Sequence, residues 1–557
     1  MLAFAFKGED SYGNALLDGE MPVQENLDDH FAKLAIHYLE QAINECDSEA
    51  VPLPLLQALT LTTHWLLAQG ACGRAWRYLG LCVRCAYELN LHLIDSGRTW
   101  EDILANPAQW QDDEERRRVW WAIWEMDVFA SVMRRYPTAI DMSHNETWLP
   151  AEDGKWYRGE PQRSCLLAKR TVDRCHLLEA SGNQSPKAWF IVINSMVKDA
   201  QNISSPFGVR RDRHRKFQGP TRGNDCQTDT RCGDEALAVK AASDRLSAID
   251  RSLQCCVIAL PTQLKYHDEF LSFGGRMKDR ASALAQRLHH GAIYSIHLMV
   301  QLVRLVTYKY YIFHGGRRSP LPFSDAHGAK QIPVQGEATP KQQLDRTLGM
   351  MRESPYLEQY FEAADQIMTI VHRSSENHHR FVNPFLSSTV WLAAVVQLIH
   401  CELAQTEVEK DLAHSSYEIL NRKYNQSAQH WNTLTSLRKD IDALRNELGS
   451  FQGDEQDQES GGSNRQSPAQ IYGLRSSNIG ANQGTQRRQH CLNQESCPQH
   501  GTVINKSNVL EPVAKYHVGR PILISGQHET GPERQTLKGR MCGTGTNAAN
   551  YSPSGPA

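Results

Sequence analysis

Apolar residues recur at helical spacing along most of the chain. From residue 27 to about residue 450 they return every three or four positions, the period of one face of an α-helix. Segment 54–70 begins with Pro54, which suits a first helical turn, and ends at Gly70; segment 73–92 follows after a short break. No Asn-Gly pair lies between alternating apolar runs, so signals for β-hairpins are lacking. The pattern predicts an all-α fold, a multi-helix array of antiparallel helix pairs.

Two polar stretches interrupt this pattern. Residues 204–235 are basic and rich in helix-breaking residues, which predicts an exposed loop, and residues 315–341 are predicted to be a linker. After Phe451 the composition shifts to Gln, Gly, Ser, Asn and Pro, which predicts a disordered C-terminal tail. The predicted organisation is an irregular leader, an N-terminal helical half, a linker, a C-terminal helical half and a tail: 1–27, 28–314, 315–341, 342–450 and 451–557.

The last predicted helix, 417–451, carries an apolar stripe. Its members follow one another by threes and fours: Leu434, Leu437, Ile441, Leu444 and Leu448. About three heptads is near the minimum for a coiled coil, and a terminal helix packed on its own core has the same pattern. Core packing is the preferred interpretation, with a coiled coil as the alternative.

The stretch DDEERRRVWWAIWEMD, residues 112–127, brings charge directly against aromatic surface. Asp112 and Glu115 have the spacing of an N-terminal capping box. Two further pairs have the i,i+4 spacing of favourable ion pairs: Asp113–Arg117 and Glu114–Arg118. A helix is therefore predicted to begin at Asp112.

Apolar side chains surround the continuation of this helix. One face holds Val119, Trp120, Ile123, Trp124 and Val128, and much of the rest holds Trp121, Phe129 and Val132. A helix that is apolar nearly all round is a buried helix. Because each large aromatic side chain buries roughly 150–250 Å², this element is predicted to anchor the fold.

Asp127 is an isolated acid within that apolar surface. A buried carboxylate without a partner is costly, so it requires a basic group or several hydrogen-bond donors. The basic candidates are Arg116, Arg117, Arg118, Arg134 and Arg135. The prediction is an internal salt bridge that ties helices together, with a catalytic carboxylate as the alternative.

The motifs of several enzyme classes can be excluded. All-α terpene cyclases hold magnesium with two aspartates and a third acid three places after the second. Here Asp112 and Asp113 are followed at that place by Arg116, which repels a metal ion. The chain also contains no P-loop, no GxSxG elbow and no Rossmann glycine pattern. No enzyme activity is predicted.

Composition and charge further restrict the class of protein to which this chain can belong. The 557 residues, 40% of them hydrophobic, suffice for one large core or two moderate ones, and the net charge of −3 argues against tight nucleic-acid binding by this chain. Its 14 cysteines are scattered, which favours reduced thiols over a disulfide scaffold. The start lacks the apolar length of a secretory signal, and the apolar run 390–399 is about half a membrane span. A soluble, intracellular protein is expected.

Cysteines and histidines do not form a convincing metal site in the sequence. Cys82 and Cys85 lie within an apolar helix and lack a second pair at zinc spacing. Three other groups also fail to fit a common ligand pattern: His490, Cys491, Cys497 and His500; His290 and His297; and His372, His378 and His379. No metal or other cofactor is expected in this chain.

Residues 113–141, DEERRRVWWAIWEMDVFASVMRRYPTAID, resemble the signature of the fungal-specific transcription factor domain, also called the xylanolytic-activator regulatory domain. In that family an acidic and arginine-rich opening runs into an aromatic helix with a buried Asp, and a later extended segment ends in Leu-Pro. Segments 75–93, 181–204 and 248–264 are similar to other helices of the family. The resemblance is strong over 28–205 and weaker to about 450. It is carried by Arg116, Arg117, Arg118, Trp120, Trp121, Trp124, Asp127, Pro137, Leu149 and Pro150.

Two positions depart from the family pattern. Asn90 replaces the usual glycine before Leu91-His92, and Arg135-Tyr136-Pro137 replaces Gly-Arg-Pro. Both departures leave the predicted order of helices intact. They indicate a divergent branch of the family.

The resemblance implies a regulatory, or middle-homology, domain of a nuclear fungal transcription factor that acts in RNA polymerase II-dependent transcription. Members carry a zinc-dependent DNA-binding module toward the N-terminus, either a six-cysteine cluster or paired fingers. This chain has neither pattern, so DNA contact and zinc are expected only in a missing upstream module. Candidate partners are DNA through that module, protein co-regulators, a small-molecule effector and a homodimer mate, with no membrane. The alternative is an all-helical protein-interaction scaffold without a DNA-binding role.

A run of basic residues in the loop 204–235 is a candidate nuclear-import patch. It consists of Arg210, Arg211, Arg213, Arg215 and Lys216. An ordinary solvated loop has the same composition. Direct contact with DNA is the least favoured interpretation, and no DNA-binding residue is assigned in this chain.

Overall fold

The computed structural model describes residues 27–71, 73–134, 136–204, 230–275, 279–314, 348–349, 351–433, 439 and 441–445. All of these belong to the first of two units, Met1–Ser463 and Asn464–Ala557. Within the described ranges every regular element is a helix, and an isolated β-bridge joins Leu271 to Ser374. The all-α prediction is confirmed.

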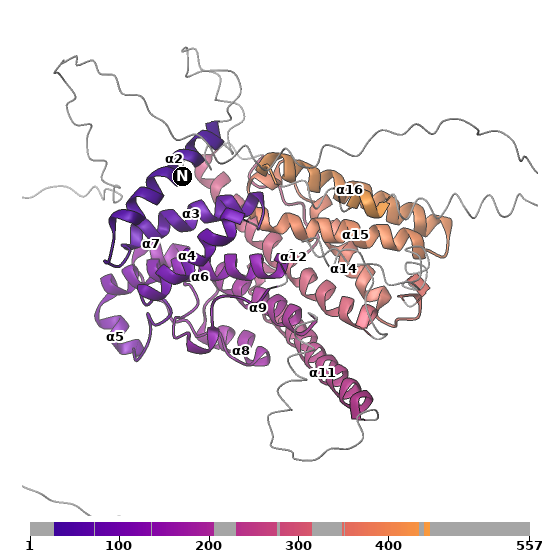
Figure 1. Ribbon diagram of the computed structural model, residues 1–557, viewed down its shortest axis with the longest axis horizontal. Helices are drawn as coiled ribbons and strands as arrows, with labels where there is room; N and C mark the ends of the chain where they lie inside the picture. The colour runs from indigo at the N-terminus through magenta and orange to yellow at the C-terminus, as the bar shows by residue number, and fades with distance from the viewer. Residues whose placement is uncertain are drawn as a thin grey trace, which may run out of the picture. The chain divides into compact units, whose positions relative to one another are not determined.

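The first helices form the part of the fold that surrounds the arginine and tryptophan segment (Figure 1). Successive members contact one another: α2 packs on α3, α3 on α4, and both α3 and α4 on α6. Their bounds are α2 Leu27–Glu45, α3 Leu53–Gln69, α4 Gly73–Glu88, α5 Trp100–Ala105 and α6 Pro107–Arg134.

A second group of helices is connected to α6 through α9. Helix α9 contacts α6, α8, α11 and α12, so it links α6 to α11 and α12, the two longest helices among the described residues. The bounds are η1 Met142–His144, α7 Asp153–Arg158, α8 Thr171–Ser181, α9 Pro186–Ser204, α11 Thr230–Ala259, η2 Thr262–Leu264 and α12 Arg280–His314.

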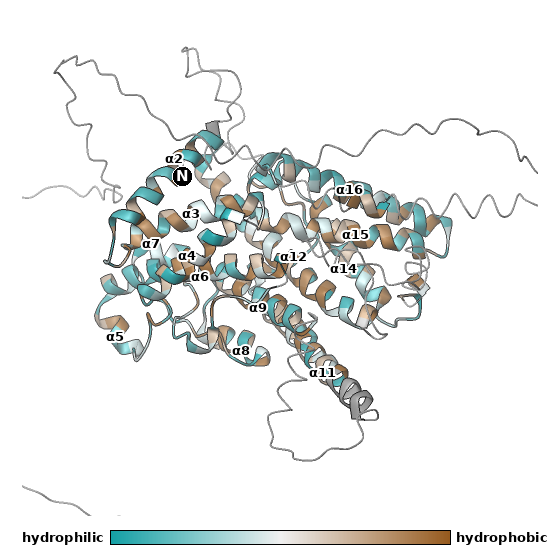
Figure 2. Cartoon of the chain, in the orientation of Figure 1, coloured by the Kyte–Doolittle hydropathy of each residue, from teal (hydrophilic) through white to brown (hydrophobic). Residues whose placement is uncertain are grey.

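The C-terminal helices pack on one another and on α12. Helix α14 contacts α12, α15 and α16, and α15 lies along α16 (Figure 1). In Figure 2, α15 is coloured largely for hydrophobic residues, whereas α16 shows hydrophilic residues beside hydrophobic ones. The bounds are α14 Leu357–His372, η4 His378–Arg380, η5 Pro384–Leu386, α15 Ser387–Leu403 and α16 Glu407–Trp431.

Helices on both sides of the predicted linker share one hydrophobic core. A single cluster of buried residues extends from Ala32 to Leu444. Phe129 of α6 stacks on Phe385 of η5, with 4.0 Å between ring centroids and 5° between ring planes. The two predicted halves therefore pack as one body within the described residues.

The signature helix begins earlier than its sequence suggests. Helix α6 starts at Pro107, which places Asp112 inside the helix, and the capping box predicted at Asp112 and Glu115 is therefore wrong. The helix start is instead marked by Asn106, whose Oδ1 accepts a hydrogen bond from the backbone N–H of Gln109 at 3.2 Å. Pro107 suits the first helical position because its missing N–H would have no intrahelical partner there.

The last predicted helix, 417–451, is not continuous. Helix α16 begins ten residues earlier and ends at Trp431, where Asn432 adopts φ +51°. Asparagine tolerates this left-handed conformation better than most residues, which explains the break. Ile441 and Leu444 are buried in the main core, as the core interpretation of the apolar stripe requires. The other stripe residues, Leu434, Leu437 and Leu448, lie outside the described residues.

Several predictions concern residues that the structure does not describe. The leader 1–27 apart from Leu27, the linker 315–341 and the tail 451–557 lie outside the described residues. The predicted basic loop 204–235 is described only at its ends, and there the prediction is wrong: Ser204 is the last residue of α9, and residues 230–235 are the start of α11. Its five candidate import residues are therefore not placed.

Segment Pro384–Leu403 is long and apolar enough to cross a membrane by length and composition. In the described structure 72% of an 18-residue apolar window of this segment is buried against other parts of the chain. Its neighbours are α14 and α16, with additional contacts to α12. This is the environment of a core helix.

Candidate functional site

Arg117 lies at the centre of a buried ionic network on α6. Its side chain is 1% exposed, with its Nη2 2.5 Å from Asp95 Oδ1 and its Nε 2.9 Å from Asp95 Oδ2. Nη1 also contacts Glu114 Oε2 at 3.3 Å. Burial alone would lower the pKa of the guanidinium, but Asp95 and Glu114 outweigh it and raise that pKa. The side chain is held charged inside the protein.

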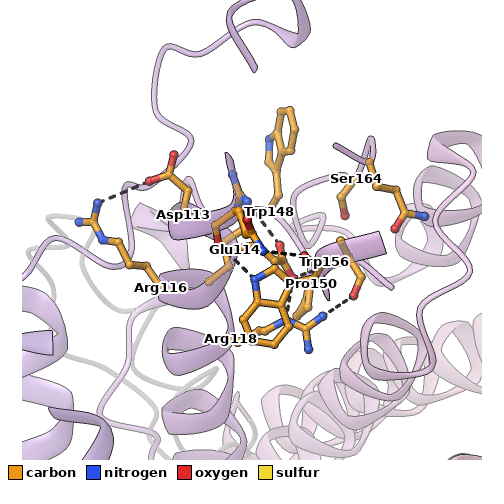
Figure 3. A network of polar contacts seen from close by, with 12 residues as sticks. Asp113, Glu114, Arg116, Arg118, Trp148, Pro150, Trp156 and Ser164 are labelled. Carbon is orange, nitrogen blue, oxygen red and sulfur yellow. Dashed lines mark hydrogen bonds and ion pairs between the residues drawn. The ribbon is translucent and has the colours of Figure 1, made fainter. Parts of the chain in front are cut away.

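Arg118 connects the same helix to the segment 151–153 (Figure 3). Its Nε lies 3.1 Å from Glu114 Oε1, and its Nη1 lies 2.6 Å from Asp153 Oδ1. Nη2 donates to the carbonyl oxygen of Ala151 at 2.8 Å. The predicted pair Glu114–Arg118 is thus present, whereas Arg117 pairs with Asp95 and Glu114 instead of the predicted Asp113.

Arg116 and Asp113 form another part of the network, in which Asp113 is fully buried and Arg116 is half-buried. Arg116 Nη1 lies 3.6 Å from Asp113 Oδ1 (Figure 3). Asp113 also forms an ion pair with Arg98. Arg116 Nη2 donates to the carbonyl oxygen of Leu89 at 3.2 Å, just beyond the end of α4. The three consecutive arginines therefore hold three different segments against α6.

The tryptophans of α6 hold the extended segment that ends in Leu149-Pro150. Trp121 Nε1 donates to the carbonyl oxygen of Trp148 at 2.7 Å, and Trp120 Nε1 donates to Asn145 Oδ1 at 2.8 Å. Both indole rings are fully buried.

Leu149 and Pro150 are joined in turn to later segments. The backbone N–H of Leu149 donates to Cys165 O at 2.9 Å, and the carbonyl of Pro150 accepts from Asn183 Nδ2 at 2.9 Å. This explains why arginines, tryptophans and Leu-Pro occur together in the signature.

Asp127 is buried as predicted, but its partners are not arginines. Its two carboxylate oxygens accept hydrogen bonds from the backbone N–H groups of Ala139 and Ile140, at 3.1 and 2.9 Å. The salt bridge predicted for this residue is therefore wrong, because two converging backbone donors satisfy the carboxylate from the segment that follows α6. Burial raises the pKa of this carboxyl, and the two hydrogen bonds only partly oppose that shift.

The arginines proposed for Asp127 have other partners or lie outside the described residues. Arg134 Nη1 donates to Ala71 O at 2.9 Å, and its guanidinium lies 4.9 Å from the ring centroid of Trp76. Arg135 is not described. The carbonyl of Pro137 accepts a weak hydrogen bond from Ser131 at 3.4 Å, so the turn that carries Pro137 returns against α6.

The departure at Asn90 has a simple backbone explanation. Asn90 adopts φ +53°, a left-handed conformation in which glycine is favoured and asparagine is tolerated. The backbone N–H of Leu91 reaches the carbonyl of Ala86 at 3.0 Å, closing the C-terminal end of α4. Asparagine can therefore replace the glycine of the family pattern without changing the turn.

A cavity of about 310 Å³ lies beside the middle of α6. Trp124 forms one side, and the segment that follows α6 contributes Met142 and Ser143. The remaining lining residues come from α8, α9 and the segment before α8: Leu167, Ala168, Lys169, Arg174, Ser195, Lys198 and Asp199. Because Asp127 fixes Ala139 and Ile140, the signature helix also positions the nearby wall formed by Met142 and Ser143.

Arg174 holds several of the lining segments of this cavity together. Its guanidinium is 2.7 Å from Asp199 Oδ2 and donates to Ser195 Oγ at 2.8 Å and to Ala168 O at 2.9 Å. Asp199 also accepts from Thr171 Oγ1 at 3.0 Å. These contacts occupy Arg174 and Asp199 with one another and with the backbone.

Lys198 stands apart from this arrangement. Its ammonium forms no hydrogen bond or ion pair with another residue that the structure describes, although Asp199 is the next residue. Burial lowers the pKa of Lys198, and the more distant carboxylates Asp199, Asp127 and Asp141 only partly oppose that shift. The lining holds three cationic side chains and one carboxylate, so the cavity favours a negatively charged occupant.

Cys82 and His290, which were considered as metal ligands in the sequence, are engaged in contacts within the fold. Cys82 is fully buried and lies 3.2 Å from Thr63 Oγ1, and His290 Nδ1 accepts from the backbone N–H of Phe273 at 3.1 Å. Among the described residues no group of three or more His, Cys, Asp or Glu side chains could hold a metal ion. The tail group containing Cys491 and Cys497 lies outside them.

Sequence reasoning identified one wall of the cavity and missed the others. Trp124 belongs to the signature, but Arg174, Lys198 and Asp199 were not singled out. A signal was available in the sequence of α9, where the mostly apolar run 188–197 is followed directly by Lys198 and Asp199. The convergence of α6, α8 and α9 depends on tertiary packing, which a pattern within one helix does not reveal.

Comparisons with known proteins agree with the signature of α6. A family model described as the fungal specific transcription factor domain matches residues 10–192. "Transcription factor tazR" from Aspergillus terreus is 27% identical over 118 residues, which cover 21% of this chain and 18% of that protein. The match thus spans less than a fifth of that relative's length. No solved structure matches this chain. Residues 10–192 are therefore similar to the fungal specific transcription factor domain, and the chain shares a distant likeness with a fungal transcription factor.

Proposed function

We propose that this chain is the regulatory, or middle-homology, domain of a nuclear fungal transcription factor. It acts in RNA polymerase II-dependent transcription and controls output by binding an effector or a partner protein. The observation that carries the proposal is the family match over residues 10–192, which includes the whole of α6 and its ionic network. The cavity beside α6 gives such a domain a place at which to receive a signal.

Helix α6 is suited to connect that cavity to the C-terminal helices. Trp124 lines the cavity, and the next residue, Glu125, accepts a hydrogen bond from Asn383 Nδ2 at 2.7 Å. Glu125 also forms an ion pair with Lys187 of α9. A ligand that binds one arrangement of α6 more tightly than another would shift the population of both arrangements. The change would reach the segment before α15 through these contacts.

Contact with DNA is assigned in this proposal to a different part of the protein. The net charge of −3 does not provide the basic surface that phosphate binding requires. A separate zinc-dependent module, located upstream of this domain, would read the DNA site, and this domain would work without a cofactor. Co-regulator proteins and a second copy of the chain are further proposed partners.

A tethered reporter tests the regulatory role. The full chain is fused to an unrelated DNA-binding module in yeast, with a reporter gene behind the matching site. We expect the fusion to give a reporter output different from that of the DNA-binding module alone. The control variant Arg117→Ala, which removes the centre of the buried network, should return the output to the level of the module alone. Equal output from the wild-type fusion and the module alone would favour the scaffold alternative.

A further inference from the structure

We propose that the cavity beside α6 binds a small carboxylate-bearing metabolite with an apolar, aromatic-sized body. The proposal rests on the regulatory function proposed above, because it identifies the effector site of that domain. Two unpartnered donors carry it: the indole N–H of Trp124 and the ammonium of Lys198. Both side chains belong to the lining of the same cavity, and they come from different helices.

The indole nitrogen of Trp124 is the first observation. Trp124 is 1% exposed, and its Nε1 has no hydrogen-bond partner among the described residues. The neighbouring indoles of Trp120 and Trp121 both donate to acceptors at 2.8 and 2.7 Å. A buried donor without a partner is rare and costs stability. The nitrogen is closed to water in this arrangement, so an acceptor atom of a bound ligand would satisfy it only after the surrounding side chains move slightly apart.

Lys198 is the second, independent observation. It is half-buried on α9, and it has no ion pair although the cavity contains a carboxylate, because Asp199 is held by Arg174 and Thr171. An unpaired ammonium in a partly desolvated site is unfavourable. A ligand carboxylate would provide the missing charge and would accept hydrogen bonds from Lys198 and Trp124 together.

The remaining lining defines the rest of the ligand. The indole ring of Trp124, Met142 and Leu167 provide apolar surface, and Lys169 is an exposed cation at the same cavity. The volume of about 310 Å³ is at the lower end of the range for small-molecule sites, roughly 300–1,000 Å³. These properties fit a compact organic anion better than a bare inorganic ion or a peptide.

A direct binding measurement tests this assignment. The purified full chain is titrated with 2-naphthoate in a calorimeter, and with 2-naphthamide, which has the same ring system without the charge. We expect saturable binding of the carboxylate at one site and at least about tenfold weaker binding of the amide, since hydrogen bonds to charged groups are the stronger ones. Absence of saturable naphthoate binding, or equal binding of the amide, would overturn the proposal. Inorganic phosphate should not displace naphthoate. Displacement by phosphate at an equal concentration would show that the apolar body of the ligand does not contribute to its affinity, and would contradict the proposed ligand class.

Variants of the two donors separate ligand binding from folding. Lys198→Met keeps the apolar stem and removes the charge, and Trp124→Phe keeps an aromatic ring and removes the N–H. Each should weaken naphthoate binding by about tenfold or more. Lys198→Met should melt at the same or a higher temperature than wild type, because it removes an unpaired, desolvated charge. Unchanged affinity in both variants would exclude this cavity as the site.

Lys187→Met is the matched control on the same helix. Lys187 does not line the cavity and forms an ion pair with Glu125, so this variant should lower the melting temperature and leave naphthoate affinity unchanged. Binding is measured on the purified chain without a reporter. A failure of the reporter test with intact naphthoate binding would reject the regulatory function, while loss of binding alone would reject only the ligand assignment.

Discussion

Replacing Asp127 with alanine removes both acceptors that hold the segment after α6. The carboxylate accepts from the backbone N–H groups of Ala139 and Ile140 at 3.1 and 2.9 Å, and Asp127 is 1% exposed. Alanine cannot replace these contacts, and Ile140, 2% exposed, has little access to water. The variant should therefore leave one or two buried donors without partners.

The size of the effect follows from two opposing contributions. Each hydrogen bond to a charged group is worth about 1.5–3 kcal/mol. Against this, the wild-type protein pays for burying a carboxylate, and burial is indeed the main cause that raises the pKa of Asp127. We expect a net loss of about 2–4 kcal/mol in the free energy of unfolding at neutral pH.

The assay is urea-induced unfolding of the full chain, followed by far-ultraviolet circular dichroism. Asp153→Ala is the matched control, because Asp153 also faces an arginine but its side chain is 57% exposed. Exposed ion pairs contribute about 0–1 kcal/mol, so the control should shift the midpoint little. The reasoning is refuted if the two alanine variants unfold at the same urea concentration as each other.

The pH dependence of the difference in unfolding free energy between wild type and Asp127→Ala gives a second readout. Because the pKa of Asp127 is raised in the folded state above its ordinary value of 3.8, the folded protein binds this proton more tightly than the unfolded chain. The stability advantage of wild type over Asp127→Ala should be largest below the ordinary value. This advantage should fall as the pH rises from 3.8, the ordinary pKa, through the raised pKa of Asp127 in the folded protein. At higher pH it should stay constant. An advantage that grows with pH would contradict the direction of the shift.

Three further predictions concern the ionic network, nuclear import and DNA. Arg117→Ala should lower the free energy of unfolding by about 3–5 kcal/mol, because it leaves Asp95 and Glu114 buried without their shared cation; an unchanged urea midpoint would disprove the role of this network. Replacing Arg210 and Arg211 together with alanine should reduce nuclear accumulation of a fluorescent fusion, whereas unaltered nuclear fluorescence would remove the import role. The purified chain should bind duplex DNA only weakly and in a salt-sensitive way, and nanomolar, sequence-selective binding at physiological salt would refute this.

Much of the fold could be predicted because the responsible signals are local. Helix α3 agrees with the predicted segment 54–70 to within one residue at each end, since apolar spacing and the flanking Pro and Gly residues mark it. The burial of α6 followed from apolar residues on nearly all of its faces. The start of α6 was misplaced because the acids at 112–115 mimic a capping signal five residues inside the helix.

The candidate site could be predicted only in part because its contacts join distant segments. The sequence identified Asp127 as a buried acid that needs partners, but backbone N–H groups leave no mark in a sequence, so arginines were proposed instead. Arg117 was expected to pair within its own helix, yet its main partner is Asp95, 22 residues away. The unpartnered state of Lys198 is likewise visible only once Arg174 is seen to occupy Asp199.

The tethered reporter tests most directly whether the cavity beside α6 controls this domain. The wild-type and Lys198→Met fusions are compared at equal protein abundance, checked on an immunoblot. The account predicts that the two fusions give different reporter outputs, while a fusion carrying Asp153→Ala, an exposed residue outside the cavity lining, follows wild type at the same abundance. Equal outputs from the wild-type and Lys198→Met fusions, with naphthoate binding lost in the variant, would contradict control through this cavity.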